Sequence, residues 1–241
     1  MLQVQHINKT FGKLRVLNNI SIGFERGQAV AIIGPNGSGK TTLIKSILGM
    51  VMPESGTIRF QGQPIQTDAR YRRFIGYMPQ IGRYPDNMQV GQLFDMMRDL
   101  RKGETAFDEE LIHAYKLPAI YQKTMRTLSG GTRQKVSAAL AFLFDAPVMI
   151  LDEPTAGLDP LSAEILKEKI SRENQRNKLF LITSHIMSDL EELATDVLYL
   201  VEGQLIFFKS LDALKAETGE ARLGKAIAQI MALDYGTRSA N

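Results

Sequence analysis

The sequence contains no cysteine, so it has no disulfide and no thiolate metal site. This composition is compatible with a reducing compartment, where structural disulfides are rare. Histidine is also scarce, and His6, His113 and His185 are far apart in the sequence. No tight metal site built from Cys and His side chains is therefore expected.

A long apolar run is also missing. The most apolar stretch, AALAFLFDAPVMIL, is interrupted by Asp145 and Pro147 and is too short to span a bilayer. The first ten residues, MLQVQHINKT, combine neither a basic nor an apolar region, so we expect no signal peptide. Any role at a membrane would therefore need a partner protein.

An excess of charge of one sign is absent as well. The net charge is +3 and the pI is about 9.0, which permits contact with nucleic acid or an anionic membrane but favours neither. The 241 residues are 44% hydrophobic and 23% charged, as is typical of a soluble globular protein with a sizeable core.

Apolar patterning predicts an α/β fold. Alternating Ile20, Ile22 and Phe24 indicate a half-buried strand, and a strand pair with a turn near Gly62 is expected over 56–65. The sequence also predicts buried strands and helices, followed by a hairpin that turns at Glu202-Gly203. The predicted strands cover 29–33, 74–80, 148–154, 179–185 and 196–208, and the predicted helices cover 41–50 and 161–175. This order predicts a mostly parallel sheet with helices, an antiparallel β portion near the N-terminus and a helical insertion.

The expected domain covers residues 1–218, with the helical insertion at about 81–146 and a C-terminal helical tail at 219–241. In the tail, Leu223, Ile227 and Ile230 share one helical face. A terminal helix packed on the domain explains this face more simply than a partner-binding helix.

Residues 34–42, GPNGSGKTT, fit the phosphate-loop pattern G-x-x-x-x-G-K-[ST]. Gly34 and Gly39 let backbone N–H groups approach phosphate oxygens, Lys40 supplies positive charge, and the Thr41 hydroxyl can bind Mg²⁺. A glycine-rich turn that binds nothing is the simpler alternative. The buried strand before the loop and the helix after it favour nucleotide binding.

The segment VMILDE is an apolar strand that ends in Asp152 and Glu153. Acids at this point lie at the carboxyl edge of the sheet, where ligands bind in α/β folds. Asp152 is expected to hold Mg²⁺, through water, and Glu153 to orient the attacking water. Acids that merely end a strand in solvent would be the simpler explanation if no phosphate loop were present.

A second phosphate-binding helix start is predicted at Ser129, where TLSGG precedes a helical run with Val136, Leu140, Leu143 and Phe144 on one face. Serine can cap such a helix, and the helix start attracts anions. The chain thus contains two candidate phosphate sites.

Three further residues are ambiguous when each is considered alone. Gln80 and His185 each close a predicted strand, where a polar residue is ordinary. Together with the phosphate loop, Gln80 becomes a candidate bridge between Mg²⁺ and water, and His185 a candidate contact of the γ phosphate. Phe11 is either a core residue or a face on which adenine stacks.

Five separated segments occur in the order of, and with spacing similar to, ABC-type ATPases: GPNGSGKTT, MPQ, LSGG, VMILDEPTAGLDP and TSH. The resemblance covers about residues 1–215. It implies the P-loop ABC nucleotide-binding fold, Mg²⁺-dependent ATP hydrolysis, a head-to-tail homodimer, and a membrane permease that holds the chain at the cytoplasmic face of the inner membrane. The chain departs from the family at Thr132, where glutamine is usual, and in SAALAF, where an arginine is frequent.

The resemblance also implies roles for individual residues. Glu153, His185 and Gln80 would be catalytic; Thr41, Gln80 and Asp152 would bind the metal. ATP would be bound by Phe11, Val16, Gly34, Pro35, Asn36, Gly37, Ser38, Gly39, Lys40, Thr41, Thr42, Ser129, Gly130, Gly131 and Asp159. In this family the phosphate loop, here residues 34–42, is called the Walker A loop. The signature of one subunit, here Ser129 to Gly131, faces the γ phosphate held by the Walker A loop of the other. Two phosphate-binding helix starts in one chain are then expected.

Two segments, YMPQIGRYPDNMQV and LSGGTRQKVSAALAFLF, resemble the ATPase subunit of the copper-processing ABC transporter of nitrous oxide reductase maturation. This resemblance implies a periplasmic copper-handling protein as a further partner, reached through the permease. The eleven methionines are not counted in support, since methionines such as Met88, Met96 and Met97 more often pack than bind copper.

The alternative is a soluble ABC ATPase that acts on ribosomes or DNA. Ribosome-directed types usually carry two cassettes in one chain, and DNA-repair types place a long coiled coil before the signature. This chain has one cassette and no sustained heptads in that segment, so no nucleic acid is expected as a partner. A module that binds ATP without hydrolysing it is opposed by the presence of both Glu153 and His185.

Overall fold

The computed structural model describes residues 1–66, 69–101, 103 and 107–238, with side chains up to residue 232. The chain has an α/β architecture in which strands and helices alternate along much of the sequence. It divides into one unit of residues 1–69 and 182–241, here called unit 1, and another of residues 70–181, called unit 2. The boundary falls within strand β8 (Leu179–Thr183).

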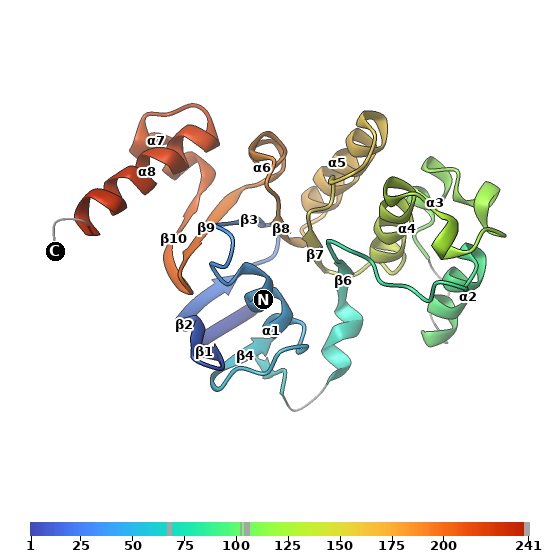
Figure 1. The fold of residues 1–241 in the computed structure, drawn as a ribbon, viewed down its shortest axis with the longest axis horizontal. Helices are drawn as coiled ribbons and strands as arrows, with labels where there is room; N and C mark the ends of the chain where they lie inside the picture. Colours follow the sequence, from blue (N-terminus) through green and yellow to red (C-terminus); the bar gives the residue numbers. More distant parts are fainter. Residues whose placement is uncertain (67–68, 102, 104–106, 239–241) are drawn as a thin grey trace. The chain divides into compact units, whose positions relative to one another are not determined.

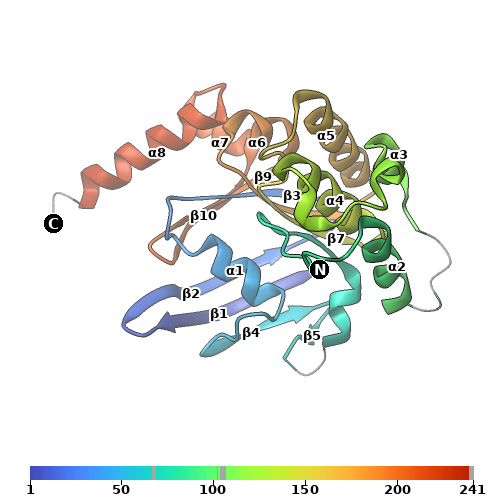
Figure 2. The same ribbon diagram turned by 45° about the vertical axis from the view of Figure 1, so that its right-hand side comes forward.

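Unit 1 contains an antiparallel sheet of order β2-β1-β4-β5, formed by β1 (Leu2–Phe11), β2 (Leu14–Phe24), β4 (Ser55–Phe60) and β5 (Gln63–Pro64). Helix α1 (Lys40–Ile47) lies against this sheet (Figure 2). Alternation along β2 buries Ile20, Ile22 and Phe24, as the sequence predicts.

The other strands of unit 1 are β3 (Ala29–Ile33), β9 (Asp196–Val201) and β10 (Gln204–Ser210), in the order β10-β9-β3 with β8 next to β3. Strand β3 runs parallel to β9, and all five of its residues are buried. A strand buried on both faces is expected to be continuously apolar, as AVAII is.

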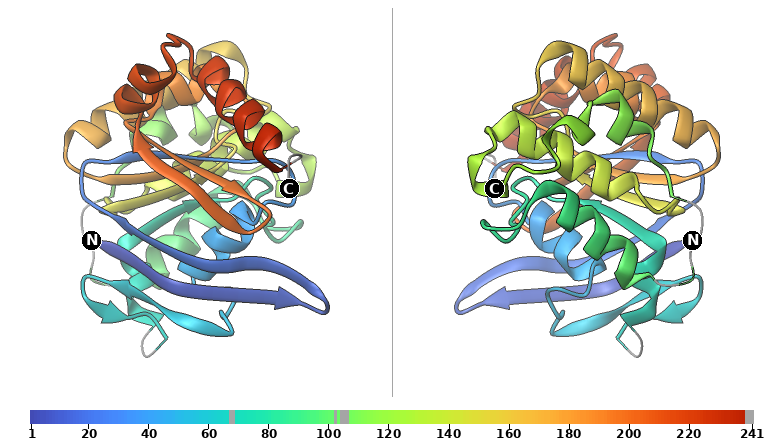
Figure 3. Two further views of the ribbon diagram at one scale, coloured as in Figure 1. Left: turned by 90° about the vertical axis from the view of Figure 1, so that its left-hand side faces the viewer. Right: turned by 90° about the vertical axis from the view of Figure 1, so that its right-hand side faces the viewer.

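Helices α6 (Met187–Leu193), α7 (Leu211–Thr218) and α8 (Leu223–Arg238) complete unit 1. Figure 3 shows α7 and α8 side by side at the red end of the chain. Leu223 and Ile227 of α8 are buried, which confirms that the terminal helix packs on its own domain. The division at residue 218 stays a prediction.

Unit 2 contains β8, β7 (Val148–Asp152) and β6 (Ile75–Met78), in that order, with β6 parallel to β7. Its helices include α2 (Val90–Leu100), α3 (Glu110–Ala114), α4 (Gly130–Phe142) and α5 (Pro160–Gln175). Short 3₁₀ turns are η1 (Ala69–Phe74), η2 (Leu117–Ile120) and η3 (Met125–Thr127). Helices α2, α3 and α4 lie together in Figure 1, within the predicted insertion.

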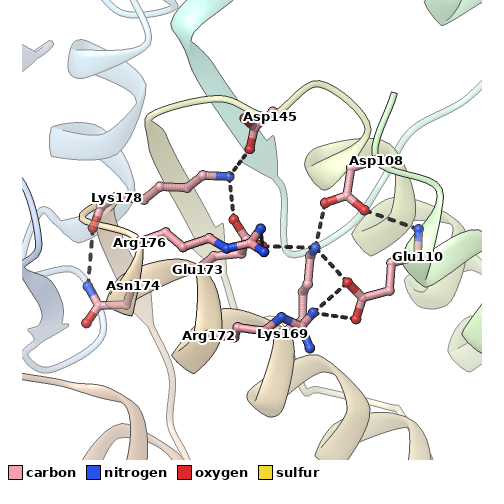
Figure 4. Close-up of polar contacts among 9 residues, drawn as sticks. All are labelled: Asp108, Glu110, Asp145, Lys169, Arg172, Glu173, Asn174, Arg176 and Lys178. Atoms are coloured by element: carbon pink, nitrogen blue, oxygen red, sulfur yellow. Dashed lines mark hydrogen bonds and ion pairs between the residues drawn. The ribbon is translucent and has the colours of Figure 1, made fainter. Parts of the chain in front are cut away.

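A cluster of charged side chains joins the insertion to α5 (Figure 4). The ammonium of Lys169, which is 2% exposed, contacts Asp108 at 2.5 Å, Glu110 at 2.9 Å and Glu173 at 3.1 Å. Lys178 contacts the second oxygen of Glu173 at 2.7 Å. Since the Glu173 side chain is fully buried, its charge depends on these two lysines and on Arg176, which pairs with it at 3.0 Å.

Several predicted boundaries are wrong by a few residues. Strands β6 and β8 end at Met78 and Thr183, so Gln80 and His185 lie in loops two residues beyond their strands. Strand β7 likewise ends at Asp152, not at residue 154. Helix α1 ends at Ile47, and α4 ends at Phe142, which leaves the buried Leu143 and Phe144 beyond the helix.

The insertion predicted at about 81–146 does not begin with a helix directly after Gln80, although the sequence pattern predicts one there. Residues 81–89 form loop and turn, and α2 begins at Val90. Pro85 provides the physical reason, because proline disfavours helical backbone at the residue before it and has no N–H to donate. The Pro85 carbonyl accepts a turn hydrogen bond from Met88 N at 3.0 Å.

Candidate functional site

The loop between β3 and α1 has a backbone that requires glycine. Gly34, Gly37 and Gly39 have φ angles of +155°, +81° and +103°. A Cβ on Gly34 would lie 2.1 Å from the carbonyl oxygen of Leu200, and one on Gly39 would lie 2.6 Å from that of Val16. Both close approaches exclude any side chain, so the loop is held tightly against its neighbours.

This loop has unsatisfied groups that suit a phosphate. Helix α1 begins at Lys40 with Gly39 as its N-cap, and no side chain caps it. The Ser38 hydroxyl is buried and has no hydrogen-bond partner among the described residues. An uncapped helix start and an unpaired buried hydroxyl fit an anion that binds there.

Lys40 folds back on the loop. Its ammonium donates hydrogen bonds to the carbonyls of Gly34 at 2.7 Å and Pro35 at 3.0 Å. These carbonyls hold the only charged side chain of the segment 34–42 at the loop itself. The lysine is thus positioned to exchange carbonyl oxygens for the more strongly charged oxygens of a phosphate.

Unit 1 contains further residues that are predicted to bind the nucleotide, and Val16 is one that contacts this loop. The Val16 carbonyl abuts Gly39, so Val16 lies at the loop. Phe11 is half exposed at the end of β1, and the Lys9 ammonium lies 5.1 Å from its ring centre. Pro35, Asn36 and Thr41 are exposed, and Thr42 is half-buried; His185 is exposed in the loop after β8.

Unit 2 presents the acidic strand end. Asp152 and Glu153 are buried, with 8% and 7% of their surfaces exposed. Glu153 has a φ of +53°, a left-handed backbone conformation that is uncommon for any residue other than glycine. Burial raises the pKa of the nearby Tyr77 hydroxyl, and the charge of Asp152 raises it further.

The uncommon backbone at Glu153 is held by Gln134 of α4, a residue that the sequence reasoning missed. The Gln134 amide, itself buried, donates to the carbonyl of Glu153 at 3.0 Å and is 3.4 Å from that of Pro154. In the sequence Gln134 lies away from the apolar face of Val136, Leu140 and Leu143, so no pattern could have identified it. Its contact ties the helix after Ser129 to the acidic strand end.

Ser129 caps α4, as predicted. Its hydroxyl accepts from Thr132 N at 3.3 Å and shares a second hydrogen bond of 2.8 Å with the Thr132 hydroxyl. Thr132, the departure from the usual signature, thus orients the serine. Gly130 and Gly131 form the first turn of the helix.

Gly131 packs against the segment after Glu153. A Cβ on Gly131 would lie 2.6 Å from the Gly157 carbonyl oxygen, whereas one on Gly130 would meet nothing within 4 Å. The second glycine is therefore required by packing inside this chain. Next to Gly130 the start of helix α4 is not covered by other atoms of this chain that the structure describes.

Asp159 has a structural role of its own. It caps α5 by accepting from Ser162 N at 3.0 Å and from the Ser162 hydroxyl at 2.8 Å, and it pairs with Lys135 at 2.7 Å. The hydrogen bond from Lys135, followed by those from Ser162, holds the Asp159 pKa well below its usual range. Lys135 and the neighbouring Tyr115, whose hydroxyl donates to the Ser162 carbonyl, were also missed by sequence reasoning.

The donor set fits Mg²⁺ because the Thr41 hydroxyl, the Gln80 amide and the Asp152 carboxylate all offer oxygen. Thr41 belongs to unit 1 and the other two to unit 2. Within the residues described, no group of three or more His, Asp or Glu side chains gathers as a metal site. No helix in that part of the chain has the length and apolar character to cross a membrane.

Comparison with known proteins identifies a matching family and several relatives. The family described as ABC transporter matches residues 17–156. The ABC transporter ATP-binding protein YtrB of Bacillus subtilis is 31% identical over 219 residues, which are 90% of this chain and 74% of the relative. The Nod factor export ATP-binding protein I of Burkholderia lata is 32% identical over 213 residues, which are 85% of this chain and 69% of the relative. The lantibiotic transport ATP-binding protein SrtF of Streptococcus pyogenes is 31% identical over 212 residues, which are 88% of this chain and 92% of the relative.

Solved structures resemble the fold. An ATP-binding subunit of an ABC transporter superposes with a TM-score of 0.89 at 26% identity and covers 96% of this chain and 99% of its own. A dimeric ATP-binding cassette in a post-hydrolysis state with ADP and Pi has a TM-score of 0.78 at 22% identity, over 88% of this chain and 99% of its own. The predicted fold class is thus confirmed.

Proposed function

Because the chain belongs to the ABC transporter family, we propose that it is the ATP-hydrolysing subunit of a membrane transporter, held by a permease at the cytoplasmic face of the cell membrane. The observation that carries this proposal is the glycine-constrained loop at α1, with its uncapped helix start, the unpaired Ser38 hydroxyl and Lys40 held at the loop. ATP with Mg²⁺ is the nucleotide of this family, and the loop fits its phosphates.

Each predicted residue then has a chemical task. The N–H groups of the loop and Lys40 bind the β and γ phosphates, while Thr41, Gln80 and Asp152 hold Mg²⁺. The metal, when bound, neutralises charge on the phosphate oxygens. Glu153 orients and polarises the attacking water, and Gln134 fixes the backbone from which the Glu153 side chain projects.

Glu153→Gln tests hydrolysis. The variant is expected to bind ATP normally and to hydrolyse it about 10²–10⁴-fold more slowly, because the amide cannot accept the proton or polarise water as the carboxylate does. Glu164→Gln is the matched control, since Glu164 is an exposed acid of α5 whose carboxylate pairs with Lys167. Near-normal turnover by Glu153→Gln would refute the assignment.

The chain acts as a homodimer in which Ser129, Gly130 and Gly131 of one subunit contact the γ phosphate held by the other. Ser129 caps a helix whose start is open at Gly130, as such a contact requires. Ser129→Arg is expected to abolish hydrolysis and to leave ATP binding at the Walker A loop of the same chain intact.

Mixing Ser129→Arg chains with Lys40→Ala chains tests the arrangement. A mixed dimer has one site with both changes and one site with neither, so it regains part of the activity that each homodimer lacks. Subunit exchange must first be shown with two distinguishable tags. If mixed dimers form and stay inactive, either each site is not built from both subunits or the two sites cannot work independently.

The permease docks on the segment 81–98. Its first part, with α4, lines a cavity of about 270 Å³, whose rim includes Ile81 with 72% of its surface exposed. The chain has no cysteine, so a single cysteine at Tyr84 or Met88 gives a unique crosslink to the permease in the native assembly. No crosslink from any position in 81–98 would refute this docking site.

The transported substrate is a separate question. The resemblance of two segments to a copper-processing transporter suggests that ATP turnover by the assembly supports copper-centre maturation of nitrous oxide reductase, with a periplasmic copper-handling protein as a further partner. Deleting the chain would then yield a reductase that lacks its copper centres, while the purified chain binds no copper tightly. The Nod factor and lantibiotic relatives favour export of an organic compound instead. A copper-replete reductase in the deletion strain would favour that second candidate.

A further inference from the structure

The turn of the β9–β10 hairpin, Glu202-Gly203, contacts the phosphate loop at 34–42. The Gly203 N–H donates to the Ser38 carbonyl at 3.1 Å, and the Gly203 carbonyl accepts from Asn18 N at 2.8 Å. Figure 2 shows this orange turn beside the blue loop that enters α1. The phosphate loop is thus tied to a hairpin that is far away in the sequence.

Position 203 requires glycine, both for its backbone conformation and for space. Gly203 has a φ of +75°, and a Cβ there would lie 2.5 Å from the carbonyl oxygen of Val16. The same oxygen would lie 2.6 Å from a Cβ on Gly39. The Val16 carbonyl is therefore enclosed between the hairpin turn and the phosphate loop, and a side chain on either glycine would push the two apart.

The hydrogen bond from Gly203 fixes the orientation of a neighbouring donor. The Ser38 C=O and the Gly39 N–H belong to one planar trans peptide unit, so they point in opposite directions. Gly39 is the N-cap of α1, and the first N–H groups of a helix have no partner inside that helix. Because Gly203 holds the Ser38 carbonyl on one side, the Gly39 N–H is held on the other side, where a phosphate at this helix start would accept it.

The conformation of a hairpin turn does not by itself explain this contact. Gly62, in the turn between β4 and β5, has a similar φ of +82°, but a Cβ on Gly62 would meet no described atom within 4 Å. Both glycines allow the backbone of a tight turn, and of the two only Gly203 also packs against the phosphate loop. This pair of glycines therefore separates the need of the turn from the contact with the site.

We propose that Gly203 is a positioning residue for nucleotide binding, because its N–H holds the Ser38-Gly39 peptide with the Gly39 N–H facing the phosphates. The proposal rests on the proposed function, since it takes the phosphate loop to bind ATP. Gly203 acts through this peptide and not on the nucleotide. The N–H groups of such loops contact the α and β phosphates, which ATP and ADP share, so the effect falls on both nucleotides.

The first experiment compares Gly203→Ala with the matched control Gly62→Ala by equilibrium binding of ATP and ADP and by steady-state hydrolysis. Both changes strain a backbone with positive φ, but only Gly203→Ala displaces the turn from the loop. Gly203→Ala is expected to weaken binding of both nucleotides about tenfold or more, the usual effect of losing a hydrogen bond to a charged group. Its KM for ATP should rise while kcat is kept, since the contact is made equally in the ground and transition states.

Gly62→Ala should bind both nucleotides as the wild type does. Wild-type affinity of Gly203→Ala, or a loss that Gly62→Ala shares, overturns the proposal. A loss confined to ATP also overturns it, because the contact would then involve the γ phosphate. A lower kcat with unchanged KM overturns it as well, since that result indicates only a smaller folded fraction.

A spectroscopic readout follows the Gly39 N–H directly. Labelling serine with ¹³C at its carbonyl and glycine with ¹⁵N selects the amides of Ser-Gly pairs, of which the sequence has three, at 38–39, 55–56 and 129–130. Saturating ADP is expected to shift the Gly39 amide proton equally in the wild type and Gly62→Ala, and less in Gly203→Ala. An equal shift in all three proteins overturns the proposal.

The wild type alone provides a test if Gly203→Ala does not fold. A phosphate bound to the Gly39 N–H polarises the shared peptide unit and strengthens the hydrogen bond that the Ser38 carbonyl accepts. Hydrogen exchange of the Gly203 amide should therefore slow when ADP binds. Unchanged exchange in a chain that binds ADP overturns the positioning role while the proposed function stands. A wild-type chain that binds neither ATP nor ADP overturns the proposed function, and this proposal with it.

Discussion

Replacing Lys169 by methionine tests whether the charge cluster holds the insertion to α5. The substitution keeps a similar length and removes the ammonium, which contacts Asp108, Glu110 and Glu173; the Lys169 side chain as a whole is 2% exposed. Three carboxylates would then lie around an uncharged side chain, and only Lys178 and Arg176 would remain to pair with Glu173 (Figure 4).

The expected loss follows from burial. Breaking a buried ion pair by removing one partner typically costs about 3–5 kcal/mol, because the remaining charge stays buried without compensation. Arg176→Met is the matched control. Arg176 also pairs with Glu173, at 3.0 Å, but its side chain is 65% exposed, so its removal should cost less than about 1 kcal/mol.

Lowering the pH should shrink the difference between Lys169→Met and the wild type. Burial alone would raise the pKa of the Glu173 carboxyl, but hydrogen bonds from Lys178 and Lys169 outweigh it and hold the pKa below 4.5. Such a group stabilises the folded state fully above the unfolded value of 4.5 and loses this contribution as the pH falls through the lower folded value. Without Lys169 the clustered carboxylates take up protons at higher pH, which relieves their repulsion.

Urea unfolding of both variants and the wild type at pH 7 and pH 4.5 checks these statements, with hydrogen exchange of α3 and α5 amides as a local readout. At pH 7 we expect a clearly lower midpoint and faster exchange for Lys169→Met only. Equal losses for Lys169→Met and Arg176→Met would refute the argument from burial. A difference that grows toward acid pH would refute the electrostatic explanation.

Two further predictions concern the helix after Ser129. Gly131→Ala should lower the melting temperature and ATPase activity, since its Cβ would lie 2.6 Å from the Gly157 carbonyl oxygen; Gly130→Ala, with no atom within 4 Å, should be neutral in thermal unfolding. The reverse order would contradict the packing. Gln134→Leu leaves the buried carbonyl of Glu153 without its amide donor, which costs about 1–3 kcal/mol of local stability. Its kcat should fall while nucleotide affinity, measured by equilibrium binding, stays unchanged; an unaltered kcat would exclude a positioning role.

The sequence alone predicts much of the fold because its signals are local. The continuous apolar run AVAII, the glycines that follow it and the serine at 129 each act within a few residues, so strand β3, the phosphate loop and the cap of α4 are where the patterns indicate. Boundaries are less accurate, since strand ends such as Met78 and Thr183 depend on hydrogen bonds to neighbouring strands.

Contacts between distant segments could be decided only by the tertiary structure. Nothing near Gln134 in the sequence indicates that its amide binds the Glu153 carbonyl, or that Lys169 meets Asp108, 61 positions away. These contacts exist because folding brings helices and strand ends together, and a buried polar group must then find whichever partner lies within about 3 Å. The sequence determines which groups can bind phosphate and metal, since that chemistry belongs to single side chains; the tertiary structure decides which residues hold them in place.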